Sequence, residues 1–269
     1  MTTLGGAAGA ARGAASSDKL TLVARVGYAV SGVLHLLIGW LALQSALGGG
    51  GTSADQSGAL SRIAAQPFGE LLLWVGVAGF VALGLIYLSQ GVWTSQRTGE
   101  RVKDVAKGVV YVALAWTTYG FASGAGSSSS EQSADATRRL MEMPGGRLLV
   151  GVVGVVVLGV AGHHVVKGVR KRFLEDLQGG GTAGQLGPAV VRLGTVGYVG
   201  KGVALAVVGL LFGVAAWQAD PSEATGLDGA LDELRQQPFG VGLLVVVAAG
   251  LIAYGLYSFV RARYGRLRG

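Results

Sequence analysis

The chain has 269 residues, of which 51% are hydrophobic and only 14% are charged; it contains 48 glycines and no cysteine. Disorder over most of the chain is excluded because disordered segments are polar and rich in charge, and a disulfide framework or thiolate metal site is excluded by the missing cysteines. The net charge is +7, but no basic stretch is interleaved with aromatic residues as in single-strand binders, so nucleic acid is not an expected partner.

Residues 1–19 are small and polar and lack the apolar core of a cleavable signal peptide. We expect this segment to be a disordered cytoplasmic tail, followed by a first span that serves as an uncleaved anchor.

Six segments are long and apolar enough to cross a bilayer, because about 20 helical residues span about 30 Å of hydrocarbon. They also lack the polar face that a soluble core helix shows at a period of 3.6 residues. We therefore expect an all-α membrane protein with six transmembrane helices, at 23–47, 68–93, 105–123, 148–166, 196–217 and 239–260.

The distribution of basic residues predicts the orientation. One side takes the two tails and the segments after the second and fourth spans; with the adjoining ends of the spans it holds 17 of the 22 Lys and Arg residues, whereas the other side holds 10 of the 15 acidic residues. Because segments rich in Lys and Arg stay in the cytoplasm, both termini are expected there. The same side is expected to contact anionic lipid headgroups.

One two-span unit recurs three times along the chain. A marker pair lies in its first span and a proline motif precedes its second span, and the proline comes 36, 37 and 37 positions after the first marker residue. Such self-similarity indicates a repeated supersecondary unit, and we place hairpin repeats at 20–98, 99–175 and 190–265, with a cytoplasmic linker at 176–189. The marker pairs are Ser31-Gly32, Lys107-Gly108 and Lys201-Gly202, and the proline motifs are Gln66-Pro67-Phe68-Gly69, Met143-Pro144-Gly145-Gly146 and Gln237-Pro238-Phe239-Gly240.

Repeats with an even number of spans all insert the same way, which favours a pseudo-threefold bundle about an axis along the membrane normal. Small residues let helix backbones approach closely in lipid. We therefore expect the glycines Gly79, Gly154 and Gly250 to occupy equivalent packing positions. The prolines are expected where the second helices begin, since a missing N–H costs nothing there.

The threefold pattern of Gly-Tyr followed by Gln-Pro-Phe-Gly resembles the bacterial membrane family catalogued as domain of unknown function 1206. The resemblance covers about residues 20–265 and implies a protein of the bacterial plasma membrane, with no activity to transfer. The second repeat departs most, because Lys103-Asp104 stands in place of Gly-Tyr and Met143-Pro144-Gly145 in place of Gln-Pro-Phe.

The polar residues inside the spans are the candidate functional residues. Ser31, Lys107 and Lys201 are equivalent, and His35 and Tyr111 lie one helical turn further out. If the odd-numbered spans line the axis, these side chains form two layers that would contact a substrate or a lipid headgroup. The alternatives are that the lysines extend to the cytoplasmic interface and that His35 is a satisfied core residue or a proton relay.

His163 and His164 lie near the cytoplasmic end of their span, too far in depth from His35 for a shared haem. No metal-ligand spacing, cofactor motif or catalytic constellation is visible, so we expect no enzyme, cofactor or metal site. The function expected first is a non-enzymatic scaffold or accessory subunit, with a possible membrane-protein partner. A small transporter or channel is the alternative, and an anionic-lipid-binding module is the second alternative.

Overall fold

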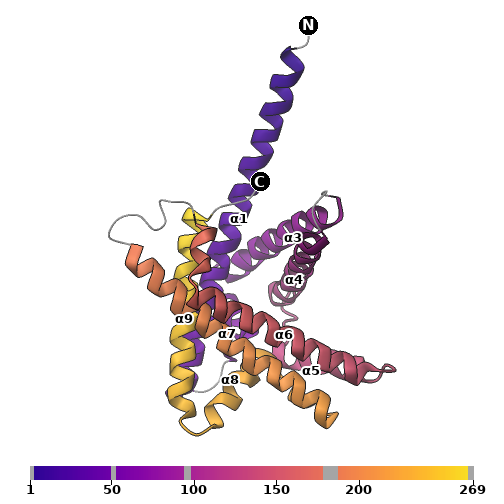
Figure 1. The fold of residues 1–269 in the computed structure, drawn as a ribbon, viewed down its shortest axis with the longest axis vertical. Coiled ribbons are helices and arrows are strands. Elements are labelled where there is room, and N and C mark those ends of the chain that lie inside the picture. Colours follow the sequence, from indigo (N-terminus) through magenta and orange to yellow (C-terminus); the bar gives the residue numbers. More distant parts are fainter. Residues whose placement is uncertain (1–2, 50–52, 94–97, 178–186, 266–269) are drawn as a thin grey trace.

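The computed structural model describes residues 3–49, 53–93, 98–177 and 187–265, and confirms the all-α class (Figure 1). Within these residues, three short helices and two 3-10 turns connect the long helices. The long helices are α1 (Thr3–Ala46), α3 (Gly69–Trp93), α4 (Thr98–Ala122), α6 (Gly146–Val169), α7 (Gly187–Gln218) and α9 (Gly240–Tyr264); the short ones are α2 (Gln56–Ala64), α5 (Ser129–Met141) and α8 (Gly226–Gln236), and the turns are η1 (Arg172–Asp176) and η3 (Pro221–Glu223).

Five helices of the described chain are long and apolar enough to cross a membrane: α1 from Arg25 onward, α3, α6, α7 and α9. The expected span 105–123 lies in α4, which is not among them. Its sequence explains the difference, because Lys107, Tyr111, Thr117 and Thr118 interrupt the apolar residues.

The N-terminal segment differs from our expectation. We expected 1–19 to be disordered, whereas α1 begins at Thr3. The segment is rich in alanine, which has the highest helix propensity of any residue. The composition that we interpreted as a flexible tail therefore also favours continuation of the helix. The middle of the expected linker, 178–186, lies outside the described residues.

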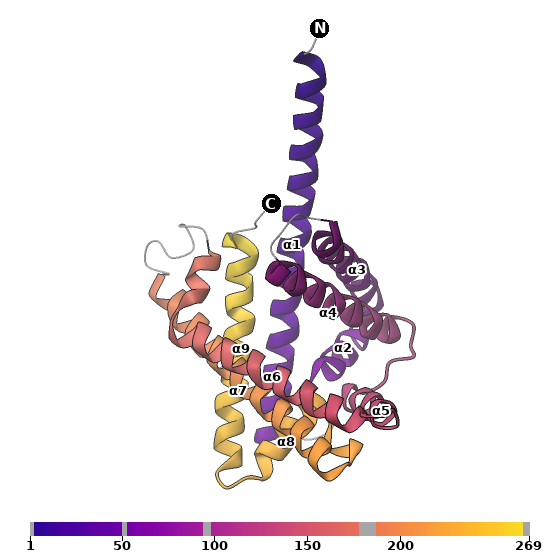
Figure 2. The ribbon, with the colours of Figure 1, turned by 45° about the vertical axis from the view of Figure 1, so that its right-hand side comes forward.

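The long helices pack most extensively as the pairs α1–α9, α3–α4 and α6–α7. Figure 2 shows α1 and α9 side by side, with α6 and α7 running obliquely to them and α3 and α4 forming a separate pair. Each pair joins the second helix of one repeat to the first helix of the next, and α9 closes back onto α1. The repeats are therefore interlocked with their neighbours. The third repeat differs from the others because its own two long helices, α7 and α9, also pack closely on each other. The two long helices of the first repeat, and those of the second, touch each other far less.

The same small-residue contact recurs in the three pairs. A Cβ placed on Gly32 would lie 3.0 Å from the carbonyl oxygen of Gly255, one on Gly84 would lie 3.5 Å from that of Gly108, and one on Gly202 would lie 2.9 Å from that of Ala161. Gly84, Ala161 and Gly255 are equivalent positions when the repeats are aligned on their prolines. The three interfaces thus share one antiparallel register, set by residues too small to separate the backbones.

The expected grouping of Gly79, Gly154 and Gly250 is wrong. When the repeats are aligned on their prolines, Gly79 and Gly250 are equivalent, but the second repeat has Val156 at that position. In the structure Gly154 packs on α7, where a Cβ would lie 3.0 Å from the carbonyl oxygen of Gly209, and Gly250 packs on Gly200. A Cβ on Gly79 would meet nothing within 4 Å. An alignment of the repeats on their glycines alone therefore places the second repeat incorrectly, whereas an alignment on their prolines places it correctly.

Each proline lies in a tight turn rather than in the first turn of the following helix. The amide of Gly69 donates to the carbonyl of Gln66 at 2.8 Å, and Gly146 and Gly240 repeat the bond. Proline is second in this turn, and a left-handed residue, with φ of about 60–75°, is third, as in a type II turn. The helices therefore begin two residues after the prolines. The third residues are Phe68, Gly145 and Phe239.

The fourth residue of the turn has to be glycine for a steric reason. A Cβ on Gly69 would collide with the carbonyl oxygen of Ile63, and equivalent collisions occur at Gly146 and Gly240. The short helix before each proline ends against this glycine, so the motif fixes the angle between the short helix and the long helix that follows it.

The three short helices lie together at the end of the bundle opposite the termini (Figure 2). The Ser129 amide at the start of α5 donates to the Ser57 hydroxyl of α2 at 3.1 Å. The Ala54 amide donates to the Asp228 carboxylate of α8 at 2.6 Å. These bonds link all three repeats through one polar layer, in which Asp55 also caps α2.

Candidate functional site

Three of the five candidate residues come together between α1 and α7. His35 Nδ1 lies 2.8 Å from the carbonyl oxygen of Ser31, and Lys201 Nζ lies 3.1 Å from His35 Nε2. An ammonium group can only donate, so Nε2 accepts from Lys201 and Nδ1 carries the proton that it donates to Ser31. This geometry requires a neutral imidazole beside a charged lysine.

Tyr254 of α9 completes this group, which we call the Lys201 cluster: Ser31, His35, Lys201 and Tyr254. Lys201 Nζ lies 4.3 Å from the centroid of the Tyr254 ring, a cation–π distance. The Tyr254 and His35 rings lie 4.7 Å apart. Among the described residues no carboxylate forms an ion pair with Lys201, so its charge is held by a nitrogen lone pair and an aromatic face.

Tyr254 was missed by sequence reasoning. When the repeats are aligned on their prolines, the first repeat has Leu83 at this position and the second has Val160. The repeat comparison that selected the other residues therefore gave no signal here. Only the packing of α7 against α9 brings Tyr254 to Lys201.

Lys107 and Tyr111 lie apart from the Lys201 cluster, between α4 and α3. Lys107 Nζ is 3.0 Å from the Asp104 carboxylate and 5.0 Å from the centroid of the Tyr87 ring. Tyr111 stacks on the same Tyr87 ring at 5.5 Å. The Lys107 side chain is 53% exposed. The structure thus divides the five candidates into two groups, each at an interface between repeats.

The paired histidines also acquire distinct places. In the alignment on the prolines, His164 occupies the position that Tyr87 holds in the first repeat. Its Nδ1 is 2.9 Å from the carbonyl oxygen of Val160, and its ring lies 5.8 Å from that of Tyr198. His163 is exposed. His164 therefore belongs to the packed α6–α7 interface, whereas His163 does not.

A second polar group closes the end of the bundle at which the C-terminus lies. The Arg261 guanidinium donates to the hydroxyls of Tyr28 and Tyr198 at 3.0 and 3.4 Å, so the tyrosines of two Gly-Tyr motifs converge on one side chain. Arg261 also lies 3.7 Å from the Asp176 carboxylate, which pairs with Lys167 at 2.6 Å. These contacts hold η1 against α6 and α9.

The buried Tyr257 hydroxyl reinforces this end by donating to the carbonyl oxygen of Phe173 at 3.0 Å. Together with the ion pairs of Asp176, this bond holds the beginning of the expected linker against the bundle.

The chemistry available to the Lys201 cluster is proton or anion binding. Two positive charges 3.1 Å apart repel each other strongly, so His35 and Lys201 together hold one positive charge rather than two. Within the described residues no three His, Cys, Asp or Glu side chains come together as a metal site would require.

A relative that covers most of the chain is an uncharacterized protein, YxxB, of Bacillus subtilis (strain 168), which is 32% identical over 248 residues, 89% of each chain. No solved structure matches the sequence. The threefold repeat is confirmed by a family model that matches residues 26–94, 102–171 and 196–265. By this match the chain belongs to the family described as Domain of Unknown Function (DUF1206).

Proposed function

We propose that this chain crosses the bacterial plasma membrane six times, with both termini in the cytoplasm. Five helices support this by their length and apolar composition. The support for α4 as the sixth is its antiparallel packing along α3 and its Trp116, which is 74% exposed. Trp116 is equivalent to the exposed Trp40 of α1 when the repeats are aligned on their marker pairs. Large exposed apolar side chains on a helix are typical of a surface that faces lipid or a partner.

Within the membrane we propose a non-enzymatic role as a scaffold or accessory subunit, and the observation that carries it is a face of α6 that no other described residue covers. Of the 18 consecutive residues that form the most apolar part of α6, only 17% are buried inside the chain. One exposed face recurs at helical spacing and is apolar along its length. We call it the α6 stripe, made of Leu148, Val152, Val155, Gly159, Gly162, Val166 and Val169.

Two glycines at the middle of the α6 stripe support this role. A Cβ placed on Gly159 or Gly162 would meet nothing within 4 Å, whereas one on Gly154 of the same helix would press against α7. Small residues in a span allow another helix to approach closely. The α6 stripe therefore fits a helix of a partner membrane protein in the way that Gly154 fits α7.

Isolation of the tagged chain from its native membranes tests this role. A stoichiometric membrane-protein partner should copurify with the wild type and be lost with the double variant Gly159→Leu/Gly162→Leu. The matched control is Val153→Leu/Val160→Leu, which enlarges exposed positions of α6 outside the stripe and should retain the partner. The scaffold role is refuted if no partner copurifies, or if the glycine variant retains it.

A small transporter is the second candidate function, because the Lys201 cluster places a cation between helices of different repeats, and no carboxylate of the described segments pairs with it. Intramembrane ionisable groups commonly mark substrate or proton pathways. The test is flux of protons or inorganic phosphate into proteoliposomes. Flux abolished by Lys201→Met and retained by Lys107→Met would support transport, whereas flux no greater than in protein-free liposomes would contradict it.

A further inference from the structure

Phe68 and Phe239 combine an unfavourable backbone with an exposed ring. Their φ angles are +63° and +61°, in the left-handed region that bulky side chains avoid. Their side chains contact little of the chain, since the residues are 81% and 91% exposed. At the equivalent place in the second repeat Gly145 adopts the same conformation, with φ +75°. The turn itself therefore needs no side chain here.

The chain gains nothing from these two rings by itself. Glycine would adopt the same turn without strain, and burial of apolar surface, which stabilises a ring elsewhere, is almost absent here. The part of the chain that the structure describes therefore leaves both rings largely uncovered.

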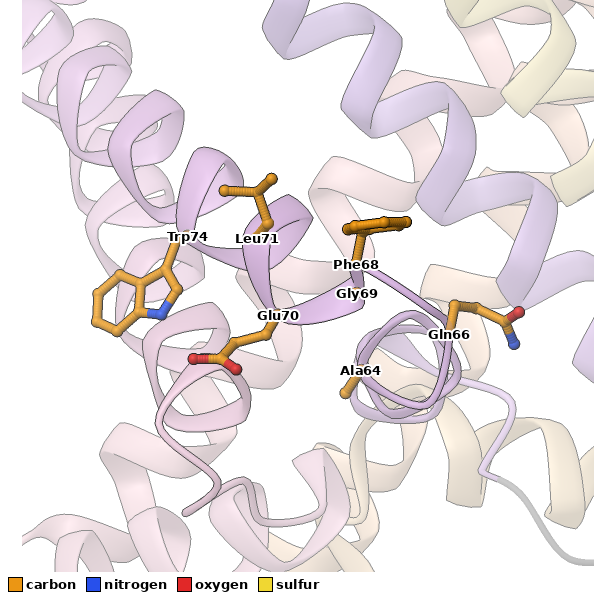
Figure 3. A pocket seen from close by; sticks show the side chains of 7 residues that line it. All are labelled: Ala64, Gln66, Phe68, Gly69, Glu70, Leu71 and Trp74. Carbon is orange, nitrogen blue, oxygen red and sulfur yellow. The ribbon is translucent and has the colours of Figure 1, made fainter.

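The position of the rings indicates what covers them. Phe68 and Phe239 directly precede α3 and α9, which are both apolar enough to cross a membrane. Figure 3 shows Phe68 and Leu71 on one side of the first turn of α3, and the Glu70 carboxylate on the other, around an open hollow that Trp74 also lines. Apolar and aromatic side chains next to a charged one fit the boundary between acyl chains and headgroups.

We propose that Phe68 and Phe239 are membrane anchors, whose rings insert into the headgroup–acyl boundary of the outer leaflet and fix the depth at which α3 and α9 enter the bilayer. The proposal rests on the proposed membrane crossing of these helices. The second repeat, with Gly145, has no anchor at this position.

The absence of cysteine permits a direct measurement of depth. Single-cysteine variants of the full chain at positions 68 and 239 are spin-labelled in phosphatidylcholine–phosphatidylglycerol vesicles and exposed to oxygen, which enters the bilayer, or to a water-soluble nickel chelate. Labels at 68 and 239 should collide more with oxygen, and labels at the neighbouring exposed residues Gln66 and Gln237 should collide more with nickel. Equal nickel accessibility at all four positions would overturn the anchor proposal.

A label at Val246, which is 67% exposed on α9, separates a failure of the anchor proposal from a failure of the proposed membrane crossing. If this label is shielded from nickel while 68 and 239 are not, α9 crosses the membrane and only the anchors are wrong. If the label at Val246 is also accessible to nickel, the membrane crossing of α9 fails as well.

Substitutions separate the role of the ring from that of the backbone. In lipid nanodiscs Phe239→Ala should lower the midpoint of thermal unfolding by about 2–4 °C, since it keeps the strained φ and removes the ring. Phe239→Gly should lower it less, because glycine relieves the strain. A midpoint in lipid that Phe239→Ala leaves unchanged would show that the ring contributes nothing and would overturn the proposal.

Discussion

Gly200 of α7 and Gly250 of α9 are in backbone contact: a Cβ added to Gly200 would lie 2.6 Å from the Cα of Gly250, and one added to Gly250 would lie 2.7 Å from the Cα of Gly200. A backbone atom cannot move aside as a flexible side chain can. The close approach of α7 and α9 at this point therefore depends on the absence of two methyl groups.

Gly200→Ala or Gly250→Ala should destabilise the chain by about 1–3 kcal/mol through overpacking. The measurement is the midpoint of thermal unfolding in detergent micelles, which should fall by about 2–4 °C for each kcal/mol. The matched control is Gly79→Ala, where the added methyl group meets nothing within 4 Å. Equal midpoints for Gly250→Ala and Gly79→Ala would contradict the packing described here.

The sequence was sufficient to predict the number of repeats, the apolar character of five long helices and the positions of the three proline motifs. It was not sufficient to predict which helices pair. The five span-length helices are apolar on most faces, so no polar face shows which side of them meets a neighbour. The contact between Gly32 and Gly255 joins residues from the first and third repeats, and a hairpin pattern contains no information about it.

The candidate site could be predicted only in part for a related reason. Ser31, His35 and Lys201 were found because they are polar residues in apolar spans. Their contact across α1 and α7 depends on helix rotation, which the sequence does not specify. Tyr28 and Tyr198 were visible as Gly-Tyr pairs, but their convergence on Arg261 became evident only from the folded chain.

The contact between His35 and Lys201 predicts strong coupling in a double-mutant cycle. His35→Leu removes the acceptor of Lys201 and leaves a partly buried ammonium group without it, whereas Lys201→Met removes the charge itself. His35→Leu should therefore be the more destabilising single change, and Lys201→Met should rescue part of that loss. We expect an interaction free energy of about 0.5–3 kcal/mol from unfolding midpoints of the four proteins.

Lys107→Met is the comparison for this cycle. Its ion pair with Asp104 involves a side chain that is 53% exposed, so its loss should change stability by about 0–1 kcal/mol. Strictly additive effects of His35→Leu and Lys201→Met would show that the two side chains do not interact in the folded protein.

Asp228 predicts a pH dependence of the polar layer formed by the short helices. Burial raises the pKa of its carboxyl above the usual value, although the hydrogen bond from the Ala54 amide acts in the opposite direction. A carboxyl whose pKa is raised on folding stabilises the folded state most when protonated, and this contribution is lost as pH rises through the folded pKa. Asp228→Asn should therefore remove a decrease in the unfolding midpoint that the wild type shows as pH rises above about 4.

Asp220 should make a contribution to stability whose pH dependence has the opposite sign. Hydrogen bonds from the side chain and amide of Ser222 lower the pKa of this exposed carboxyl, so its small contribution is lost as pH falls. Asp220→Asn should leave the decrease assigned to Asp228 in place. The same pH dependence of the midpoint in wild type and Asp228→Asn between pH 4 and 7 would contradict the assignment to Asp228.

The turn at each proline motif predicts that its last glycine tolerates no side chain. Gly69→Ala, Gly146→Ala and Gly240→Ala each bring a methyl group against a carbonyl oxygen of the preceding short helix, at Ile63 in the first case. The short helix has to shift, and because α2 and α5 share the bond between Ser57 and Ser129, a shift in one repeat disturbs the next. We expect each change to destabilise by more than about 2 kcal/mol, as strained backbone positions do.

Gly145→Ala, one residue earlier, is the control. It adds a methyl group that meets nothing within 4 Å and bears only the cost of a positive φ, about 1–2 kcal/mol. A midpoint for Gly146→Ala at or above that of Gly145→Ala would show that the collision is relieved without cost and that the glycine does not fix the turn.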